Sequence, residues 1–550
     1  FLRLRFTLSN NLLFSLNPRH SSGGVIFDDG SCGGARAKKA GAMELAAEDQ
    51  SPGELINASG HRQELDRNFS LLSICAVAVT TGNTWIAQGG SVVTALSNGG
   101  PSGVIYEFIA VSVCYWLVAA SIAELASGMP SSSGVYHWAS ITAGKYGRAC
   151  GFFAGFWNCL AWILGAASMS AILGQQTVSM YALMHPGFVP QSWHIFVSFI
   201  ICTWLCCSIV LFMNRMLPHI GNLGMFFILA GVFITIIVCA VMPHVNGTGY
   251  ASNSDVWRTW QNGTGYSSEG FVFVAGMLNG AYSVGTPDCS THLAEEIPRP
   301  SRNIPKAVLA QMTVGFITGI LYMIAVFYSI TDLDAVISSV YGFPLAEIYY
   351  QATGSRGGAL GLLIVAFLPT VITCAGCYIT AGRTLWTISR DKATPFSGWL
   401  ARINTRMHNP FNATLVCGVI VTILACIYVG STTAFNAFVG CFVQLSSLSY
   451  CAAILPHLLT RRSTFTPGHF WMGRIGYLIN ALSCIYILAF VVIFCFPYAL
   501  PTDAASMNYA SLLTGGLTIF VTIWWLFRMK SYEGPKFIPL TDKVLMDDAK

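Results

Sequence analysis

Charged residues are scarce in this chain. Only 10% of its 550 residues are Asp, Glu, Lys or Arg, whereas soluble globular chains carry about 25%. A soluble protein needs charge to cover its surface, and 54% of these residues are hydrophobic instead. The composition excludes a string of soluble domains and predicts an all-α polytopic membrane protein.

Catalytic and cofactor-binding patterns are also lacking. The 18 cysteines lie almost entirely in apolar runs, and Cys374-x-x-Cys377 has no histidine or second pair beside it, so we interpret these residues as packing groups. Outside the apolar segments we find no nucleophile–base set and no phosphate-binding glycine loop. We therefore expect no enzyme, no cofactor and no ATP as energy source. The formal charge of +5 gives no reason to expect nucleic acid as a partner.

Apolar segments of the length needed to cross a bilayer, about 20 residues, recur along the chain. We predict twelve transmembrane helices, at residues 70–97, 103–127, 149–181, 193–213, 218–242, 270–296, 307–330, 358–388, 412–429, 433–458, 475–496 and 508–528.

The lysines and arginines predict the orientation of these helices. Of the 29 in the chain, all except Arg258 and Arg356 lie in the two tails, in alternate loops or at the adjoining span ends. Basic residues concentrate on the cytosolic side of membrane proteins. We therefore expect both termini in the cytosol.

Three regions follow from this arrangement. Residues 1–69 form a cytosolic amino tail, residues 70–530 a twelve-helix transporter domain and residues 531–550 a cytosolic carboxyl tail. Within the amino tail, Met43 opens an acidic polar run, and we hypothesise that translation starts there, so that residues 1–42 are not translated. Their basic residues leave a targeting segment as the alternative.

Two of the predicted helices are interrupted in their middle. The first contains Ala78-Val-Thr-Thr-Gly-Asn-Thr-Trp85 and the sixth contains Asn279-Gly-Ala-Tyr-Ser-Val-Gly-Thr-Pro-Asp288. Glycine weakens a helix, and Pro287 lacks the backbone N–H that a helix uses. Interrupted helices in corresponding positions of two inverted halves indicate the central site of a transporter. A pair of packing kinks is the alternative interpretation.

Two loops carry recognisable sequence motifs. Residues 295–307 read EEIPRPSRNIPKA, and residues 123–138 read AELASGMPSSSGVYHW. Both resemble signatures of the amino acid–polyamine–organocation transporter superfamily. This resemblance implies a leucine-transporter-like fold, with a 5+5 inverted repeat, discontinuous helices 1 and 6, and two peripheral helices.

The first interrupted helix narrows the resemblance to one branch. Residues 80–108, TTGNTWIAQGGSVVTALSNGGPSGVIYEF, look like the fungal amino acid/choline permease branch, and most like its choline permeases. The resemblance implies import of choline or a related small amine at the plasma membrane, driven by protons. Some relatives carry a lysine early in helix five that stands in for a coupling ion, whereas this chain has His219-Ile-Gly-Asn222 there.

The candidate substrate-binding residues flank the two interruptions. They are Thr81, Gly82, Asn83, Thr84, Trp85, Tyr282, Ser283, Val284, Gly285 and Asp288. Choline has no N–H to donate, so aromatic faces and carboxylate charge must hold it. We expect Trp85 and Tyr282 to supply the aromatic faces, and we interpret three aromatic residues of the third helix, Phe156, Trp157 and Trp162, as packing or lipid-facing groups.

Three carboxylates lie in or beside the predicted helices. Glu107 and Glu124 are close to the ends of the second helix, where we expect them to be solvated. Asp288 is deeper, and it serves either to cap the following half-helix or to bind a cation or proton.

Other functions remain open at this point. A permease for 4-aminobutyrate or another amino acid would have the same fold, as would a nutrient sensor that does not transport. A sensor tends to have long cytosolic tails, which this chain lacks if translation starts at Met43.

Overall fold

The structure, a computed structural model, describes residues 60–61, 64–65, 67–339, 341–430, 433–504 and 506–535. These residues form helices and loops with two isolated β-bridges, and the part of the chain described contains no strand. The all-helical class is therefore confirmed. The predictions for residues 1–42, and for most of the carboxyl tail, lie outside the described residues.

The first predicted span is a broken helix, as expected. α2 (Leu71–Thr81) and α3 (Thr84–Leu96) are separated by Gly82 and Asn83. The Ser70 hydroxyl caps α2 by accepting from the Ser73 amide at 3.2 Å. At Gly82 a side chain would collide with the Gln311 carboxamide, so the break also needs glycine for close approach.

The sixth predicted span is broken as well. α10 (Glu269–Val284) ends where residues 285–290 leave the helix, and the 3₁₀ helix η3 (Thr291–Glu296) follows. The backbone freed there needs partners, because no water is available in a bilayer core. The Tyr450 hydroxyl lies 3.2 Å from the Gly285 carbonyl, and Gln311 Nε2 donates to the Thr286 carbonyl at 2.9 Å.

Gln311 joins the two breaks. It lies in α11 (Pro300–Tyr328), packed beside Gly82 of the first break and bonded to Thr286 of the second. We expect Gln311→Met to lower the free energy of unfolding by about 1–3 kcal/mol, because the hydrogen bonds from Gln311 to both the carbonyl and the hydroxyl of Thr286 are lost. The folded fraction after heating, followed by size-exclusion chromatography of the detergent-solubilised protein, measures this loss. Unchanged thermal stability would contradict it.

The remaining long helices coincide with the other predicted spans. They are α4 (Gly100–Gly128), α6 (Gly147–Met184), α7 (Ser192–Phe212), α8 (Leu217–Val245), α14 (Arg356–Arg390), α16 (Phe411–Gly430), α17 (Ala434–Leu459), α18 (Ile475–Ile493) and α19 (Tyr509–Arg528). The short ones are α5 (Val135–Thr142), η1 (Gly144–Tyr146), η2 (Asn214–Met216), α9 (Asn253–Trp257), α12 (Leu333–Ile337), α13 (Pro344–Thr353) and α15 (Ser397–Leu400).

Ten helical segments in the described residues are long and apolar enough to cross a membrane, with the broken α2–α3 pair counted as one. The 16-residue α10 and the apolar stretch Phe411–Ile427 of α16 are shorter. A polytopic membrane protein is therefore supported, and the number of twelve crossings stays a prediction.

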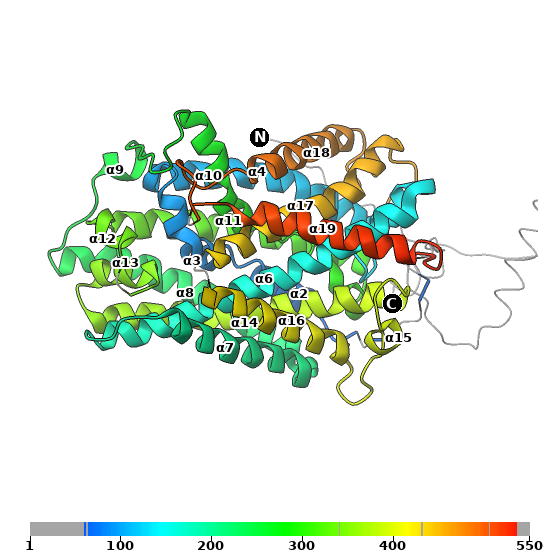
Figure 1. Cartoon of the computed structure of the whole chain (residues 1–550), viewed down its shortest axis with the longest axis horizontal. Coiled ribbons are helices and arrows are strands. Elements are labelled where there is room, and N and C mark those ends of the chain that lie inside the picture. Colours follow the sequence, from blue (N-terminus) through cyan, green and yellow to red (C-terminus); the bar gives the residue numbers. More distant parts are fainter. Residues whose placement is uncertain are drawn as a thin grey trace, which may run out of the picture. The chain divides into compact units, whose positions relative to one another are not determined.

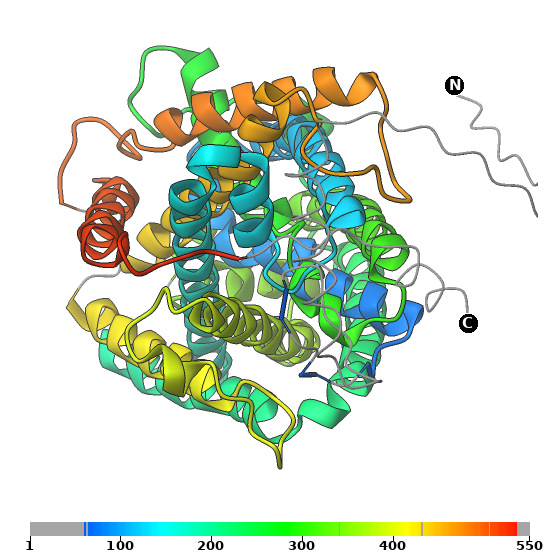
Figure 2. The same cartoon turned by 90° about the vertical axis from the view of Figure 1, so that its right-hand side faces the viewer.

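The interior of the bundle is built around α6. Its most apolar stretch is 89% buried, against 17% for α19. α19, in red, and α18, in orange, lie on the outside in both views (Figures 1 and 2). Because lipid replaces water around such helices, their outward-facing leucine, isoleucine and phenylalanine side chains need no protein cover.

The two signature motifs pack against each other. Residues 131–138, expected in a loop, are buried, and α5 begins within them at Val135. The Ser132 hydroxyl accepts from the Glu295 amide at 2.9 Å, and the Ser127 hydroxyl donates to the Ser301 carbonyl at 2.8 Å. The motifs therefore fix the end of α4 to the segment that follows the second break.

The prediction that Glu107 and Glu124 are solvated is wrong. Glu124 is fully buried, where it pairs with Arg462 and accepts from the Met472 amide at 3.0 Å. Glu107 is 1% exposed and faces Gly276 of α10. Their positions near the ends of α4 predicted contact with water. The side chain of Glu107 instead faces α10, and that of Glu124 faces the segment between α17 and α18.

Candidate substrate cavity

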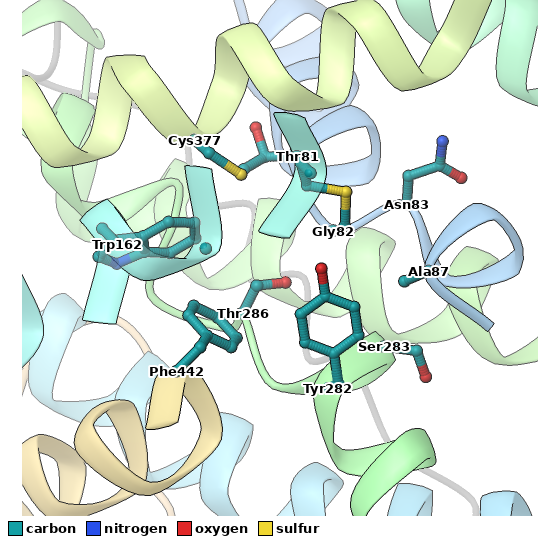
Figure 3. A pocket seen from close by; sticks show the side chains of 12 residues that line it. Thr81, Gly82, Asn83, Ala87, Trp162, Tyr282, Ser283, Thr286, Cys377 and Phe442 are labelled. Carbon is teal, nitrogen blue, oxygen red and sulfur yellow. The ribbon is translucent and has the colours of Figure 1, made fainter. Parts of the chain in front are cut away.

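A cavity of about 310 Å³ lies between the two helix breaks. Figure 3 shows residues from both breaks facing one another across it. Its wall is formed by Thr81, Gly82, Asn83, Ala87, Trp162, Gly165, Met169, Tyr282, Ser283, Thr286, Cys377 and Phe442. Five of the ten predicted binding residues are among these, namely Thr81, Gly82, Asn83, Tyr282 and Ser283.

Trp85 is outside this wall. It is fully buried, its ring lies 5.1 Å from that of Tyr322 in α11, and its edge approaches Gly231 in α8. The structure therefore does not bring Trp85 to the cavity as expected, because α3 turns it toward α8 and α11.

Three further predicted residues surround the breaks without lining the cavity. The Thr84 hydroxyl donates to the Gly82 carbonyl at 3.2 Å, which turns it back toward its own backbone. Val284 ends α10, and the Gly285 carbonyl lies 3.2 Å from the Tyr450 hydroxyl. These residues shape the breaks rather than the cavity surface.

Three aromatic rings from three helices meet at the cavity. They belong to Trp162 of α6, Tyr282 of α10 and Phe442 of α17. The Phe442 ring centroid lies 5.8 Å from each of the other two, at interplanar angles of 74° and 87°. This edge-to-face arrangement is the preferred one for aromatic pairs, and Figure 3 shows the three rings on one side of the cavity.

Hydrogen bonds hold two of these rings in place. The Tyr282 and Ser168 hydroxyls are 2.7 Å apart. Since the Ser168 hydroxyl donates to the Gly165 carbonyl at 2.9 Å, Tyr282 is the donor to Ser168. The indole N–H of Trp162 donates to Asp288 at 3.2 Å.

Asp288 is fully buried directly behind Trp162. Its carboxylate also accepts from Tyr450 at 2.6 Å and from Asn158 at 2.7 Å, and His292 Nε2 lies 3.2 Å away. These donors are side chains of α6, α17 and η3 and not the backbone N–H groups that a helix cap would bond. Asp288 therefore supplies a negative charge that is held behind the aromatic wall and does not line it.

A polar network closes one end of the cavity. Gln88 of α3 donates to Ser283 at 2.9 Å and accepts from Asn279 of α10 at 2.8 Å, and Ser91 donates to Asn279. A second cavity of about 390 Å³ lies beyond it, with Ser91, Gly276 and Asn279 in its wall. The network therefore separates the two cavities.

No charged side chain belongs to the wall of the first cavity. The Asn83 amide donates to Thr373 at 3.2 Å, but its carbonyl oxygen is buried without a partner. A ligand hydroxyl can satisfy that oxygen. The arrangement suits a small molecule whose charge is delocalised over apolar groups.

Comparison with known protein families agrees with this architecture. A sequence model for a family described as amino acid permease matches residues 69–518. The chain belongs to the amino acid permease family of the amino acid–polyamine–organocation superfamily. The permease is thus a transporter and not an enzyme.

Relatives of this permease have several different substrates. It is 30% identical to a choline transporter of Saccharomyces cerevisiae over 523 residues, which cover 94% of this chain and 91% of the relative. It is 26% identical to a GABA-specific permease of the same yeast, with coverage of 90% and 88%. A 7-keto 8-aminopelargonic acid transporter, also from this yeast, is 24% identical, with coverage of 86% and 95%.

Sequence reasoning missed several residues of the cavity wall. We predicted a packing or lipid-facing role for Trp162, which lines the cavity, and the same role for Phe156 and Trp157, which lie outside its wall. Phe156 lies against Phe152, and Trp157 donates to Thr518 of α19. Phe442 and Cys377 lie in helices without a break, so no local signal marked them.

Proposed function

We propose that this permease is a secondary active transporter that imports choline or a related small amine across the plasma membrane. The observation that carries the proposal is the group of three aromatic rings, Trp162, Tyr282 and Phe442, in a cavity wall without charged side chains. Aromatic faces attract a quaternary ammonium, and desolvated contacts of this kind contribute about 2 kcal/mol or more.

Asp288 strengthens this attraction from behind the wall. It accepts the indole N–H of Trp162, and donation to an anion makes the indole face more negative. The carboxylate also balances the charge of a bound cation in a medium of low dielectric constant. On the other side of the cavity, Asn83 offers its free carbonyl oxygen to the choline hydroxyl.

Transport follows from the broken helices. We propose twelve crossings in a 5+5 inverted repeat with both termini in the cytosol, supported by the distribution of lysine and arginine. The breaks at α2–α3 and α10–η3 face each other across the cavity, as broken helices of inverted repeats do at a substrate site. The membrane potential favours cation entry by about 2.3 kcal/mol per charge per 100 mV, and we propose protons as the coupling ion.

Transport of 4-aminobutyrate or another amino acid is the second candidate. It is favoured by the first turn of α3, which starts at the cavity and lacks a side-chain cap at Asn83. Free N–H groups at a helix start bind a carboxylate. A ligand with a carboxylate would place that group at Asn83 and its amine near the aromatic rings.

Uptake of radiolabelled choline into yeast cells that lack endogenous choline and 4-aminobutyrate carriers tests the function. We expect saturable choline uptake that excess unlabelled choline abolishes and that a protonophore collapses. Labelled 4-aminobutyrate, measured in the same cells, should enter more slowly. Preference for 4-aminobutyrate would favour the second candidate, and binding without any uptake would indicate a nutrient sensor.

A further inference from the structure

Glu107 is a buried carboxyl group without a partner. It lies in α4 with 1% of its side chain exposed, and neither of its oxygens has a hydrogen bond to the part of the chain that the structure describes. The carboxyl occupies the space beside Gly276 of α10, where a Cβ would collide with both oxygens. An ionised carboxylate is very unstable without a partner in such surroundings. The neutral acid is the form that suits this position.

No charge from the surrounding helices reaches Glu107. α3 has no titratable residue, and the acids nearest the start of α4 are bonded elsewhere, Asp255 of α9 to Ser252 and Glu269 of α10 to Trp260. Among the basic residues, Arg258 directly after α9 is exposed, and Arg302 and Lys306 lie at the start of α11, the end of that helix remote from Glu107. The other titratable groups of α10, α11, α17 and α18 are Tyr282, Tyr322, Tyr328, Cys441, Tyr450, Cys451, His457, Tyr477, Cys484 and Tyr486.

The only histidine in that set, His457, lies 4.0 Å from Glu124, near the opposite end of α4. The protonation of Glu107 therefore depends on its exposure to water and not on the charge of a neighbouring side chain.

The position of Glu107 connects it with both cavities. Gly276, against which the carboxyl packs, lines the second cavity, and Asn279 lines that cavity one turn further along α10. Asn279 belongs to the polar network with Gln88 and Ser283 that closes the first cavity. A movement of α10 that opens this network therefore also changes the surroundings of Glu107.

We propose that Glu107 is the proton-binding site through which this permease couples proton movement to its substrate. As a carboxylate exposed to water it takes a proton from the second cavity, forming an O–H bond. It is then held as the neutral acid against Gly276. When α10 moves, the acid meets water on the opposite side and returns the proton as it becomes a carboxylate again. This assignment rests on the proposed proton-driven import.

Reconstituted permease tests the assignment. Purified full-length wild type and Glu107→Gln are placed in liposomes, and labelled choline uptake is measured with and without an inward proton gradient. A gradient of one pH unit drives accumulation of about tenfold per coupled proton. We expect the wild type to respond to it and Glu107→Gln to lose the response while choline exchange without a gradient continues, because a carboxamide mimics the neutral acid.

Glu347→Gln is the matched control, since that carboxylate lies in the short helix α13 and bonds only Gln351 in the described structure. It should respond to the gradient as the wild type does. If Glu107→Gln also accumulates choline like the wild type, the assignment is overturned while proton-driven import stands. If the wild type transports choline but ignores the gradient, proton coupling fails and the assignment with it.

If Glu107→Gln fails to fold, the aspartate variant tests the assignment of Glu107 instead. Glu107→Asp keeps a titratable carboxyl but withdraws it from Gly276 by one methylene group. We expect it to keep a gradient response, with the pH profile of exchange displaced from that of the wild type. A gradient response and a pH profile identical to those of the wild type would overturn the assignment, because a coupling carboxyl must sense this change in its surroundings.

Discussion

Replacement of Trp162 by leucine is expected to raise the apparent KM for choline about thirtyfold, because a desolvated cation–π contact contributes about 2 kcal/mol. Tyr282→Leu should act similarly, since both rings line the cavity. The initial rate of labelled choline uptake over a range of concentrations, normalised to the amount of permease at the cell surface, measures the effect.

Tyr282→Phe is the matched control for this experiment. It keeps the aromatic face and removes only the hydroxyl that donates to Ser168, so its KM should stay close to that of the wild type. Trp85→Leu is a second control. Trp85 packs against Tyr322 outside the cavity, so loss of its ring should not raise the KM as loss of a ring in the cavity wall does. If Trp162→Leu and Tyr282→Leu retain the wild-type KM, the aromatic rings do not hold the substrate.

Arg383→Leu is expected to abolish most of the folded permease. The Arg383 guanidinium is fully buried in α14 and donates to both oxygens of Glu296 in η3, at 2.5 and 3.0 Å. Removing one partner leaves an uncompensated buried charge, which costs about 3–5 kcal/mol. Surface expression and the thermal stability of the solubilised protein measure the loss.

Two further variants test the origin of this effect. Replacing Arg383 and Glu296 together by leucine should restore much of the stability, because no unpaired charge remains. Arg402→Leu, at an exposed arginine, should leave stability unchanged. A double variant as unstable as Arg383→Leu alone would show that shape, and not charge, governs this contact.

The positions of the long helices and of the two breaks could be predicted from sequence. Gly82 and Pro287 alter the backbone itself, so their effect does not depend on distant partners. The position of a residue along its helix could also be predicted. Which direction a side chain faces could not, because the hydrophobic pattern of a membrane helix does not distinguish lipid from protein.

The errors at the site all have this cause. Trp85 and Trp162 are both buried tryptophans, and only the rotation of α3 and α6 places the second at the cavity. Glu107 was expected in water because it lies close to the end of its helix. Its side chain instead faces α10, which the position along the helix does not reveal. Phe442 is one apolar residue among many in α17, and it becomes recognisable only beside Tyr282.

The cavity wall combines two kinds of residue with different scope for evolutionary change. Trp162 and Tyr282 are hydrogen-bonded to the surrounding framework, whereas Phe442 and Met169 are held by packing alone. A substitution at either of the latter changes the shape of the cavity without stranding a buried polar group. Substitutions at these two positions can therefore alter which small molecule fits the cavity, while the hydrogen bonds that hold Trp162 and Tyr282 stay in place.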